Sequence, residues 1–193
     1  MANMAFSETE RKNIKERLLL NCEESWALVG YKKTNVDELC KKAGISKGSF
    51  YLFYQSKEEL FCDVMIQAQK RLVRLTEETL GSNPTKKDLT KALQLVYREY
   101  VKIPFLTETE SPDFIAFINR LSPDNFQELE NHGNYDIQEI IKQSGLTYRI
   151  EEEKGLASLA LLLTSLRDTR SLPWEYLEVF DFILETVNDT IFE

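Results

Sequence analysis

The stretch "AGISKGSFYLFYQSKEELF", residues 43–61, decides the fold of this chain. It follows a short segment whose apolar residues recur at helical spacing, and Gly44 can take the positive φ that ends a helix. Ser46 is then placed to cap a second, short helix. A helix, a glycine turn and a helix in this order predict a helix-turn-helix, with Ile45 packing the corner between the helices.

The first turn of the second helix carries the groups that would read DNA. Lys47, Gly48 and Ser49 follow the capping Ser46, at the helix end that enters the major groove in helix-turn-helix proteins. Glycine costs about 1 kcal/mol relative to Ala inside a helix. It also permits close approach of the backbone to DNA, which gives Gly48 a functional reason to be there.

Two residues further along would bind the DNA backbone. The Tyr51 hydroxyl can donate to a phosphate, and Lys57 begins the next helix, where its charge and the helix amides both favour an anion. The alternative is an ordinary three-helix corner with solvated lysines.

The longer stretch "TNVDELCKKAGISKGSFYLFYQSKEELF", residues 34–61, resembles the N-terminal signature of the TetR family of bacterial transcriptional repressors. The resemblance implies a homodimer of Ω shape whose two headpieces are spaced for a pseudo-palindromic operator. It also implies a small-molecule effector in the C-terminal domain that changes the headpiece separation. With Thr34 added by the resemblance, the predicted DNA-binding set is Thr34, Ser46, Lys47, Gly48, Ser49, Tyr51 and Lys57.

Two positions depart from the family pattern. Phe53 stands where many members have histidine or tyrosine, and Gln55 stands where a basic residue is common. Phe53 cannot bond a phosphate, so we expect fewer charged contacts with DNA. The departures keep an alternative open, a helical small-molecule-binding or scaffold protein that has lost specific DNA binding.

Helix-start signals and apolar spacing predict an all-α chain of about nine helices. Four starts fit the capping box, in which a hydroxyl residue precedes an acid by three positions: Ser7–Glu10, Thr34–Asp37, Ser56–Glu59 and Thr85–Asp88. The expected helices span about 8–29, 35–42, 47–53, 57–80, 86–103, 113–121, 124–144, 150–168 and 174–191, with a kink at Gly133. The predicted domains are a DNA-binding domain, residues 1–56, and an effector-binding and dimerisation domain, residues 57–193.

Charge is distributed unevenly along the chain, whose formal net charge is −8. Residues 1–57 carry ten Lys and Arg against seven Asp and Glu, a charge of +3, which leaves −11 for the remainder. A mildly basic N-terminal part suits DNA, whereas the acidic part would be repelled from phosphate.

Catalysis, metal binding and membrane insertion find little support in the sequence. Cys22, Cys40 and Cys62 lie singly, without disulfide or zinc spacing, and His132 is the sole histidine. There is no nucleophile and base pair and no phosphate-binding glycine loop, so we expect no enzyme, cofactor or metal. The apolar run near Leu161 is far short of the roughly 20 residues that span a bilayer. With no secretion signal at the N-terminus, we expect a cytoplasmic protein.

The last two expected helices carry wide apolar faces that could form a dimer. Their residues are Leu156, Leu159, Leu163 and Leu166 on one helix, and Leu177, Phe180, Leu184, Val187 and Ile191 on the other. Paired with a symmetry mate, such helices form a four-helix interface. The alternative is that these faces close the core of the monomer.

An effector pocket lined by aromatic and a few polar side chains would suit a flat or apolar small molecule. The candidates are Met65, Gln69, Tyr97, Tyr100, Phe114, Phe117 and Arg120. Arg120 could pair with an acidic ligand or with Glu108 or Glu110. For any one of these residues, plain core packing is the competing interpretation.

Overall fold

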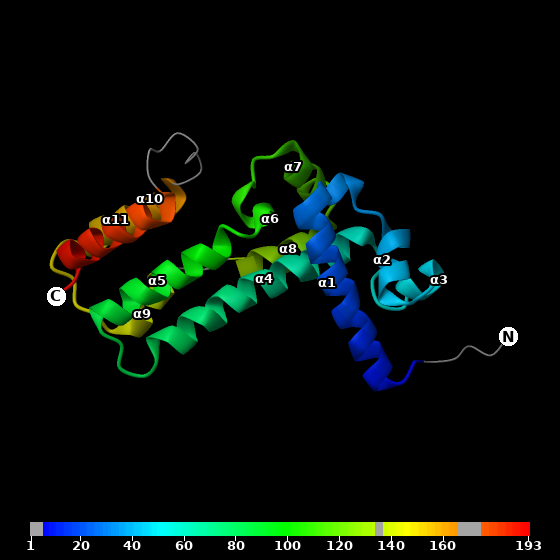
Figure 1. The fold of residues 1–193 in the computed structure, drawn as a ribbon, viewed down its shortest axis with the longest axis horizontal. Helices are drawn as coiled ribbons and strands as arrows, with labels where there is room; N and C mark the ends of the chain where they lie inside the picture. Colours follow the sequence, from blue (N-terminus) through cyan, green and yellow to red (C-terminus); the bar gives the residue numbers. More distant parts are fainter. Residues whose placement is uncertain (1–5, 134–136, 166–174) are drawn as a thin grey trace. The chain divides into compact units, whose positions relative to one another are not determined.

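A computed structural model of the chain describes residues 6–133, 137–165 and 175–193, and within these ranges the protein is built from helices (Figure 1). The eleven helices of the described ranges are α1 (Glu8–Lys33), α2 (Val36–Ala43), α3 (Lys47–Phe50), α4 (Lys57–Leu80), α5 (Lys86–Tyr100), α6 (Pro104–Thr107), α7 (Pro112–Ile118), α8 (Pro123–Gly133), α9 (Ile137–Ser144), α10 (Glu152–Ser165) and α11 (Tyr176–Ile191). The all-α fold predicted from the sequence is confirmed.

Two differences separate these helices from the nine that the sequence predicts. α6 is a single turn inside a predicted loop, too short to show a helical period in the sequence. The predicted helix 124–144 corresponds to α8 and α9, and residues 134–136 between them lie outside the described ranges. The kink expected at Gly133 therefore stays a prediction.

Side chains cap several helices where the sequence predicts it. Complete capping boxes join Ser7 to Glu10 and Thr85 to Asp88, and the Ser56 hydroxyl accepts the Glu59 N–H at 3.1 Å. The predicted box of Thr34 and Asp37 is wrong. The N-cap of α2 is Asn35, whose side chain accepts the N–H of Asp37 at 2.8 Å.

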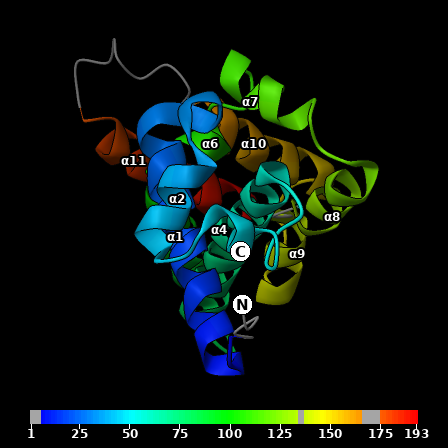
Figure 2. The same cartoon turned by 90° about the vertical axis from the view of Figure 1, so that its right-hand side faces the viewer.

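The first compact unit, called here the N-terminal unit, comprises the chain up to Gln69 together with Pro104–Gly133. Its centre is aromatic: Trp26 of α1 stacks on Phe105 of α6 with ring centroids 4.2 Å apart and meets Phe117 of α7 edge-on at 5.0 Å. α7 lies beside the C-terminal end of α1 in both views (Figures 1 and 2). Segments distant in sequence thus pack against the part of α1 that leads into the helix-turn-helix.

The second compact unit, the C-terminal unit, comprises Lys70–Ile103 and the chain from residue 134 onward. α11 packs against α5 and α10, and α9 packs against α10. The buried core of this unit includes Leu89, Leu93, Tyr97, Ile141, Leu159, Phe180, Leu184 and Phe192.

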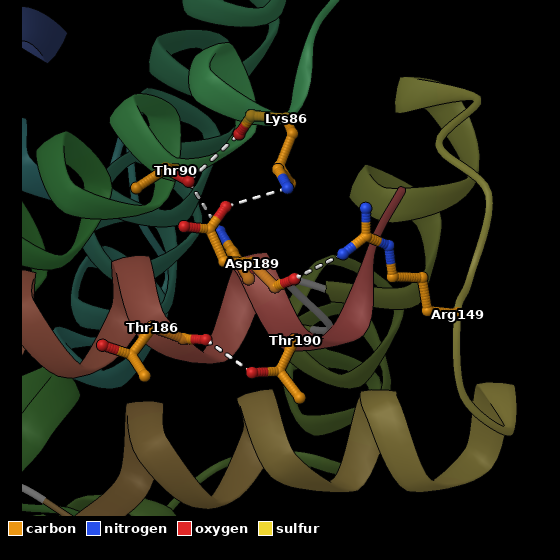
Figure 3. Close-up of polar contacts among 7 residues, drawn as sticks. Lys86, Thr90, Arg149, Thr186, Asp189 and Thr190 are labelled. Carbon is orange, nitrogen blue, oxygen red and sulfur yellow. Dashed lines mark hydrogen bonds and ion pairs between the residues drawn. The ribbon is translucent and has the colours of Figure 1, made fainter.

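A series of polar pairs joins α5 to α11. Successive positions on α5, four residues apart, meet partners in reverse order on α11: Lys86 with Asp189, Thr90 with Asn188, Gln94 with Glu185, and Arg98 with Asp181. Figure 3 shows the first of these, with the Lys86 amine pointing at the Asp189 carboxylate, 2.8 Å away. A spacing of four residues keeps these side chains on one face, so the pairs fix the register of the antiparallel helices.

The apolar faces that we predicted for dimerisation mostly serve the core of the C-terminal unit instead. The core buries Leu159, Phe180, Leu184 and Ile191, and the other four described members, Leu156, Leu163, Leu177 and Val187, pack against it. Leu166 lies outside the described residues. Helical period alone cannot separate a face that meets a partner from a face that meets the rest of the same chain.

The compact units divide the chain differently from the predicted domains 1–56 and 57–193. Residues 57–69 and 104–133 belong to the same compact unit as the helix-turn-helix. The predicted domains assign roles in DNA and effector binding, and those roles remain predictions.

Candidate nucleic-acid interface

The turn between α2 and α3 has the geometry that its sequence predicts. Gly44 takes the left-handed conformation, with φ 75° and ψ 30°. Its N–H donates to the Lys41 carbonyl at 3.2 Å, and the Ile45 N–H donates to the Cys40 carbonyl at 3.0 Å. This pair of bonds is a Schellman motif, which ends α2 sharply and turns the chain into α3.

α3 is one turn long, Lys47–Phe50, and is shorter than the predicted 47–53. Ser46 caps it, accepting the Ser49 N–H at 3.1 Å, and Phe50 is fully buried beneath it. Ser46, Lys47 and Gly48 are exposed. A rigidly anchored turn therefore presents short polar groups to solvent.

Gly48 has room for a side chain. A Cβ added there would find its nearest contact at 3.8 Å, the Ser46 hydroxyl, and the backbone needs no positive φ. Packing inside the protein thus gives no reason for a glycine at this helical position, which is consistent with close approach by a partner.

Lys47 is paired with an acid of the preceding helix. Its Nζ lies 2.9 Å from Oδ2 of Asp37, and both side chains are more than half exposed. The hydrogen bond and the charge of Asp37 raise the pKa of Lys47. The lysine predicted to meet DNA therefore has an acidic partner in the free protein.

Two predicted phosphate contacts point into the protein. Lys57 donates to the Tyr31 carbonyl at 2.5 Å, and its ammonium lies 4.2 Å from the centre of the Tyr31 ring. Burial lowers the pKa of Lys57. Thr34 is only 4% exposed, and its hydroxyl donates to the Gly30 carbonyl at 2.8 Å. In this conformation neither group is offered to a phosphate.

Arg11 contributes a contact that sequence reasoning missed. Its guanidinium donates to the Leu52 carbonyl at 3.0 Å and lies over the Phe53 ring, 5.1 Å from its centre. Phe6 adds a ring contact to Phe53 at 5.8 Å. The start of α1 thus holds the segment that follows α3, where Tyr51 and Leu52 are exposed. No local sequence signal marks a contact across 41 positions.

The residues proposed for an effector fall in both units. Phe117 is fully buried in the aromatic centre of the N-terminal unit, and Phe114 meets it edge-on at 5.9 Å. Met65 is buried and Gln69 is half-buried in α4. Arg120 is exposed, and its hydrogen bond with the Tyr31 hydroxyl raises the pKa of the guanidinium.

Tyr97 and Tyr100 belong to the C-terminal unit. Tyr97 is stacked on Phe180 with centroids 4.0 Å apart, and Tyr100 lies 6.4 Å from Tyr97. Burial raises the pKa of Tyr97 to about 12. The contacts of this pair are those of core residues, and an effector role for them remains a prediction.

The described residues contain no group of three or more His, Cys, Asp or Glu side chains that could hold a metal ion. The three cysteines are free and buried, and burial raises the pKa of the Cys62 thiol to about 11. No helix in the described part of the chain is long and apolar enough to cross a membrane.

The sequence is similar to known transcriptional regulators. The sequence signature described as "Bacterial regulatory proteins, tetR family" matches residues 22–64. The HTH-type transcriptional regulator YdgC of Bacillus subtilis (strain 168) is 25% identical over 177 residues, covering 83% of this chain and 87% of that protein.

Solved structures share the fold. The TetR family transcriptional regulator PfmR from Thermus thermophilus matches with a TM-score of 0.63 and 21% identity, over 90% of this chain and 97% of that one. A putative TetR-family regulator from Rhodococcus sp. matches with a TM-score of 0.68 and 15% identity, over 96% and 100%. Over residues 22–64 the chain therefore carries the TetR-family signature, and its fold is that of solved TetR-family regulators.

Proposed function

We propose that this regulator is a cytoplasmic repressor that binds a pseudo-palindromic operator as a homodimer and responds to a small molecule. The observation that carries the DNA-binding step is the exposed first turn of α3. It offers Ser46, Lys47 and Gly48 on a backbone fixed by the Schellman turn and by buried Phe50. Short side chains and a glycine let this turn enter a major groove, where base edges carry distinct donors and acceptors.

The proposed dimer uses the last two helices, through residues that the core leaves outside. Leu161 of α10 and Phe182 of α11 are 68% and 70% exposed, respectively. Exposed Ala157 and Ala160 on α10 would let a partner helix approach closely. Burying an exposed leucine or phenylalanine contributes roughly 1.5–3 kcal/mol per side chain, which supports this face as the interface.

For the effector we propose a flat or apolar molecule, contacted by members of the set Met65, Gln69, Tyr97, Tyr100, Phe114, Phe117 and Arg120. Aromatic rings with few polar groups suit such a ligand. Arg120 is the exposed cation of the set and would pair with an acidic group on the ligand.

The experiment that tests the proposal is titration of the purified protein against its own upstream DNA and against a random duplex of equal length, at several salt concentrations. We expect tight, sequence-dependent binding whose affinity falls steeply with salt. Equal and weak binding to both duplexes, followed by failure to select any sequence from random duplexes, would contradict the proposal. With operator binding established, the same titration can be used to screen small molecules for those that raise or lower the affinity of the protein for the operator.

The second candidate function is a helical ligand-binding or scaffold protein without specific DNA binding. The observation that favours it is the engagement of both predicted lysines, Lys47 by Asp37 and Lys57 by the Tyr31 carbonyl, with neutral residues at Phe53 and Gln55. This candidate predicts the equal and weak binding described above.

A further inference from the structure

The last turn of α1 is separated from the rest of the helix by a break. Gly30 has φ 83° and ψ 169°, far from helical values, and the helix resumes for Tyr31–Lys33. Asn35 then caps α2, so this short turn is the link between α1 and the helix-turn-helix. A helix that restarts after a break has N–H groups without partners in the preceding turn.

Asp113, the second residue of α7, supplies those partners. Its carboxylate accepts the Tyr31 N–H at 2.5 Å and the Lys32 N–H at 3.0 Å. This is the geometry of an N-cap, although the capping residue lies 82 positions along the chain. The carboxylate also sits directly over Gly30, because a Cβ there would fall 2.7 Å from Oδ2 of Asp113.

The other side of the link is held by the start of α4. Lys57 donates to the Tyr31 carbonyl, and the Tyr31 hydroxyl donates to the Glu58 carboxylate. The Thr34 hydroxyl closes the turn onto the Gly30 carbonyl. Tyr31 is therefore fixed at its N–H, its carbonyl and its hydroxyl, by residues of two helices outside the helix-turn-helix.

We propose that Asp113 is a positioning residue for operator binding, which sets the direction in which the chain leaves α1 for α2 and α3. The inference rests on the proposed function, because it concerns the orientation of α3 at an operator. Without the carboxylate, the Tyr31 and Lys32 N–H groups bond to water. The break at Gly30 then loses the contact that sets the angle between the main part of α1 and its last turn. α3 keeps its own turn and cap but samples several directions, so each productive encounter with DNA costs more conformational entropy.

The chain offers a matched control. Asp113 stands in the sequence Ser111-Pro112-Asp113 at the start of α7, and Asp124 stands in Ser122-Pro123-Asp124 at the start of α8. Asp124 is exposed, and like Asp113 it is the acid of the first turn of its helix. Asp113→Ala and Asp124→Ala therefore remove the same charge from the same local context.

The test measures operator affinity and salt slope for the wild type, Asp113→Ala, Asp113→Asn and Asp124→Ala, with amide hydrogen exchange of residues 28–36 in the DNA-free proteins. We expect Asp113→Ala to weaken operator binding about tenfold with an unchanged salt slope, because no phosphate contact is lost. Asp113→Asn, which keeps an acceptor oxygen, should recover part of the affinity, and Asp124→Ala should match the wild type. Tyr31 and Lys32 should exchange fastest in Asp113→Ala, at an intermediate rate in Asp113→Asn, and at the wild-type rate in Asp124→Ala.

Operator binding of wild-type strength by Asp113→Ala, or unchanged exchange at Tyr31 and Lys32, would overturn the inference. If Asp113→Ala does not fold, Asp113→Asn carries the same comparison, and wild-type affinity and exchange in that variant would overturn it. A wild-type protein that binds no operator would instead refute the proposed function.

Discussion

The ammonium of Lys47, in the first turn of α3, and the carboxylate of Asp37, in the first turn of α2, lie 2.9 Å apart on the exposed side of the helix-turn-helix. An operator that takes Lys47 must draw it away from Asp37, and it brings its own phosphates near that carboxylate. If the protein binds an operator as proposed, Asp37 would oppose that binding in two ways, by holding the lysine and by repelling the DNA backbone.

Lys47→Ala should weaken operator binding and reduce the salt slope by about one unit, because one phosphate-directed cation is lost. Asp37→Asn should strengthen binding by a few fold at most, since an exposed ion pair is weak. Fluorescence anisotropy titrations at several salt concentrations measure both. The double variant Lys47→Ala/Asp37→Asn separates the two effects of Asp37. If Asp37 acts only by holding Lys47, then Asp37→Asn should not change operator affinity when Lys47 is already alanine.

Gly48→Ala should leave the free protein as stable as the wild type, or stabilise it by up to about 1 kcal/mol, because a Cβ fits there and Ala is the better helix former. The same change should weaken operator binding by obstructing close approach. Urea unfolding and DNA titration measure the two effects. Gly155→Ala is the comparison: its Cβ would lie 3.0 Å from side-chain atoms of Ile191 and Tyr148, so a gain in stability from helix propensity requires those side chains to shift. Unchanged operator binding by Gly48→Ala would contradict the role given to this glycine.

Tyr31 makes stability sensitive to alkaline pH. Burial, with the hydrogen bond to Glu58, raises the pKa of Tyr31 to about 12 from an ordinary value of 10.0. The unfolded chain then loses the tyrosine proton first, so the contribution to stability is complete below pH 10 and is lost as pH rises toward 12. Tyr31→Phe should flatten this loss in urea unfolding between about pH 9 and about pH 11.5. An equally steep loss in the variant would show that other groups carry it.

Phe182→Glu should convert the proposed dimer to a monomer, because a carboxylate would be buried without a partner in the α10 and α11 interface. Sedimentation velocity over a range of protein concentrations measures the change. Leu28→Glu is the matched control: Leu28 of α1 is 84% exposed, more than Phe182, but lies outside the proposed interface. Dissociation by both variants, or by neither, would argue against the assigned face.

Thr90 and Asn188 form a buried polar pair in the C-terminal unit. Replacing these residues measures what an unpaired buried amide costs in stability. The Asn188 amide donates to the Thr90 hydroxyl at 2.9 Å, and its Oδ1 has no hydrogen-bond partner among the described residues. Asn188 is 1% exposed. Thr90→Val should therefore lower the free energy of unfolding by about 1–3 kcal/mol, because the Asn188 amide then has no acceptor for its N–H. Combining Thr90→Val with Asn188→Leu removes both polar groups and should recover most of that loss. Urea unfolding of the wild type and both variants measures the recovery, and an equally unstable double variant would contradict the argument.

Local signals predicted the geometry of the helix-turn-helix well. Gly44 and Ser46 act on the residues beside them, so the turn and the start of α3 could be predicted from a few positions. The α4 limits, Lys57–Leu80, agree with the prediction because a long apolar stripe averages out ambiguous positions.

Contacts that depend on tertiary packing could not be predicted in the same way. A lysine at the start of α4 favours a phosphate by local rules, yet the structure turns Lys57 onto Tyr31, 26 positions away. The capping of the α1 break by Asp113 is invisible to a search for Ser, Thr, Asp or Asn directly before a helix. The residues of a dimer face are hard to assign from sequence for a related reason. An apolar face that packs on the core of the same chain and one that meets a partner subunit recur with the same helical period.

The series of polar pairs between α5 and α11 also limits how this protein can diverge. Each member has its partner on the other helix, so a change at Lys86 or Arg98 favours a matching change at Asp189 or Asp181. A chimera that takes α11 from a relative without its α5 would place unmatched charges between the two helices. In chimeras, α5 and α11 should therefore be exchanged together. In comparisons with homologues, the paired positions of the two helices should be examined as pairs.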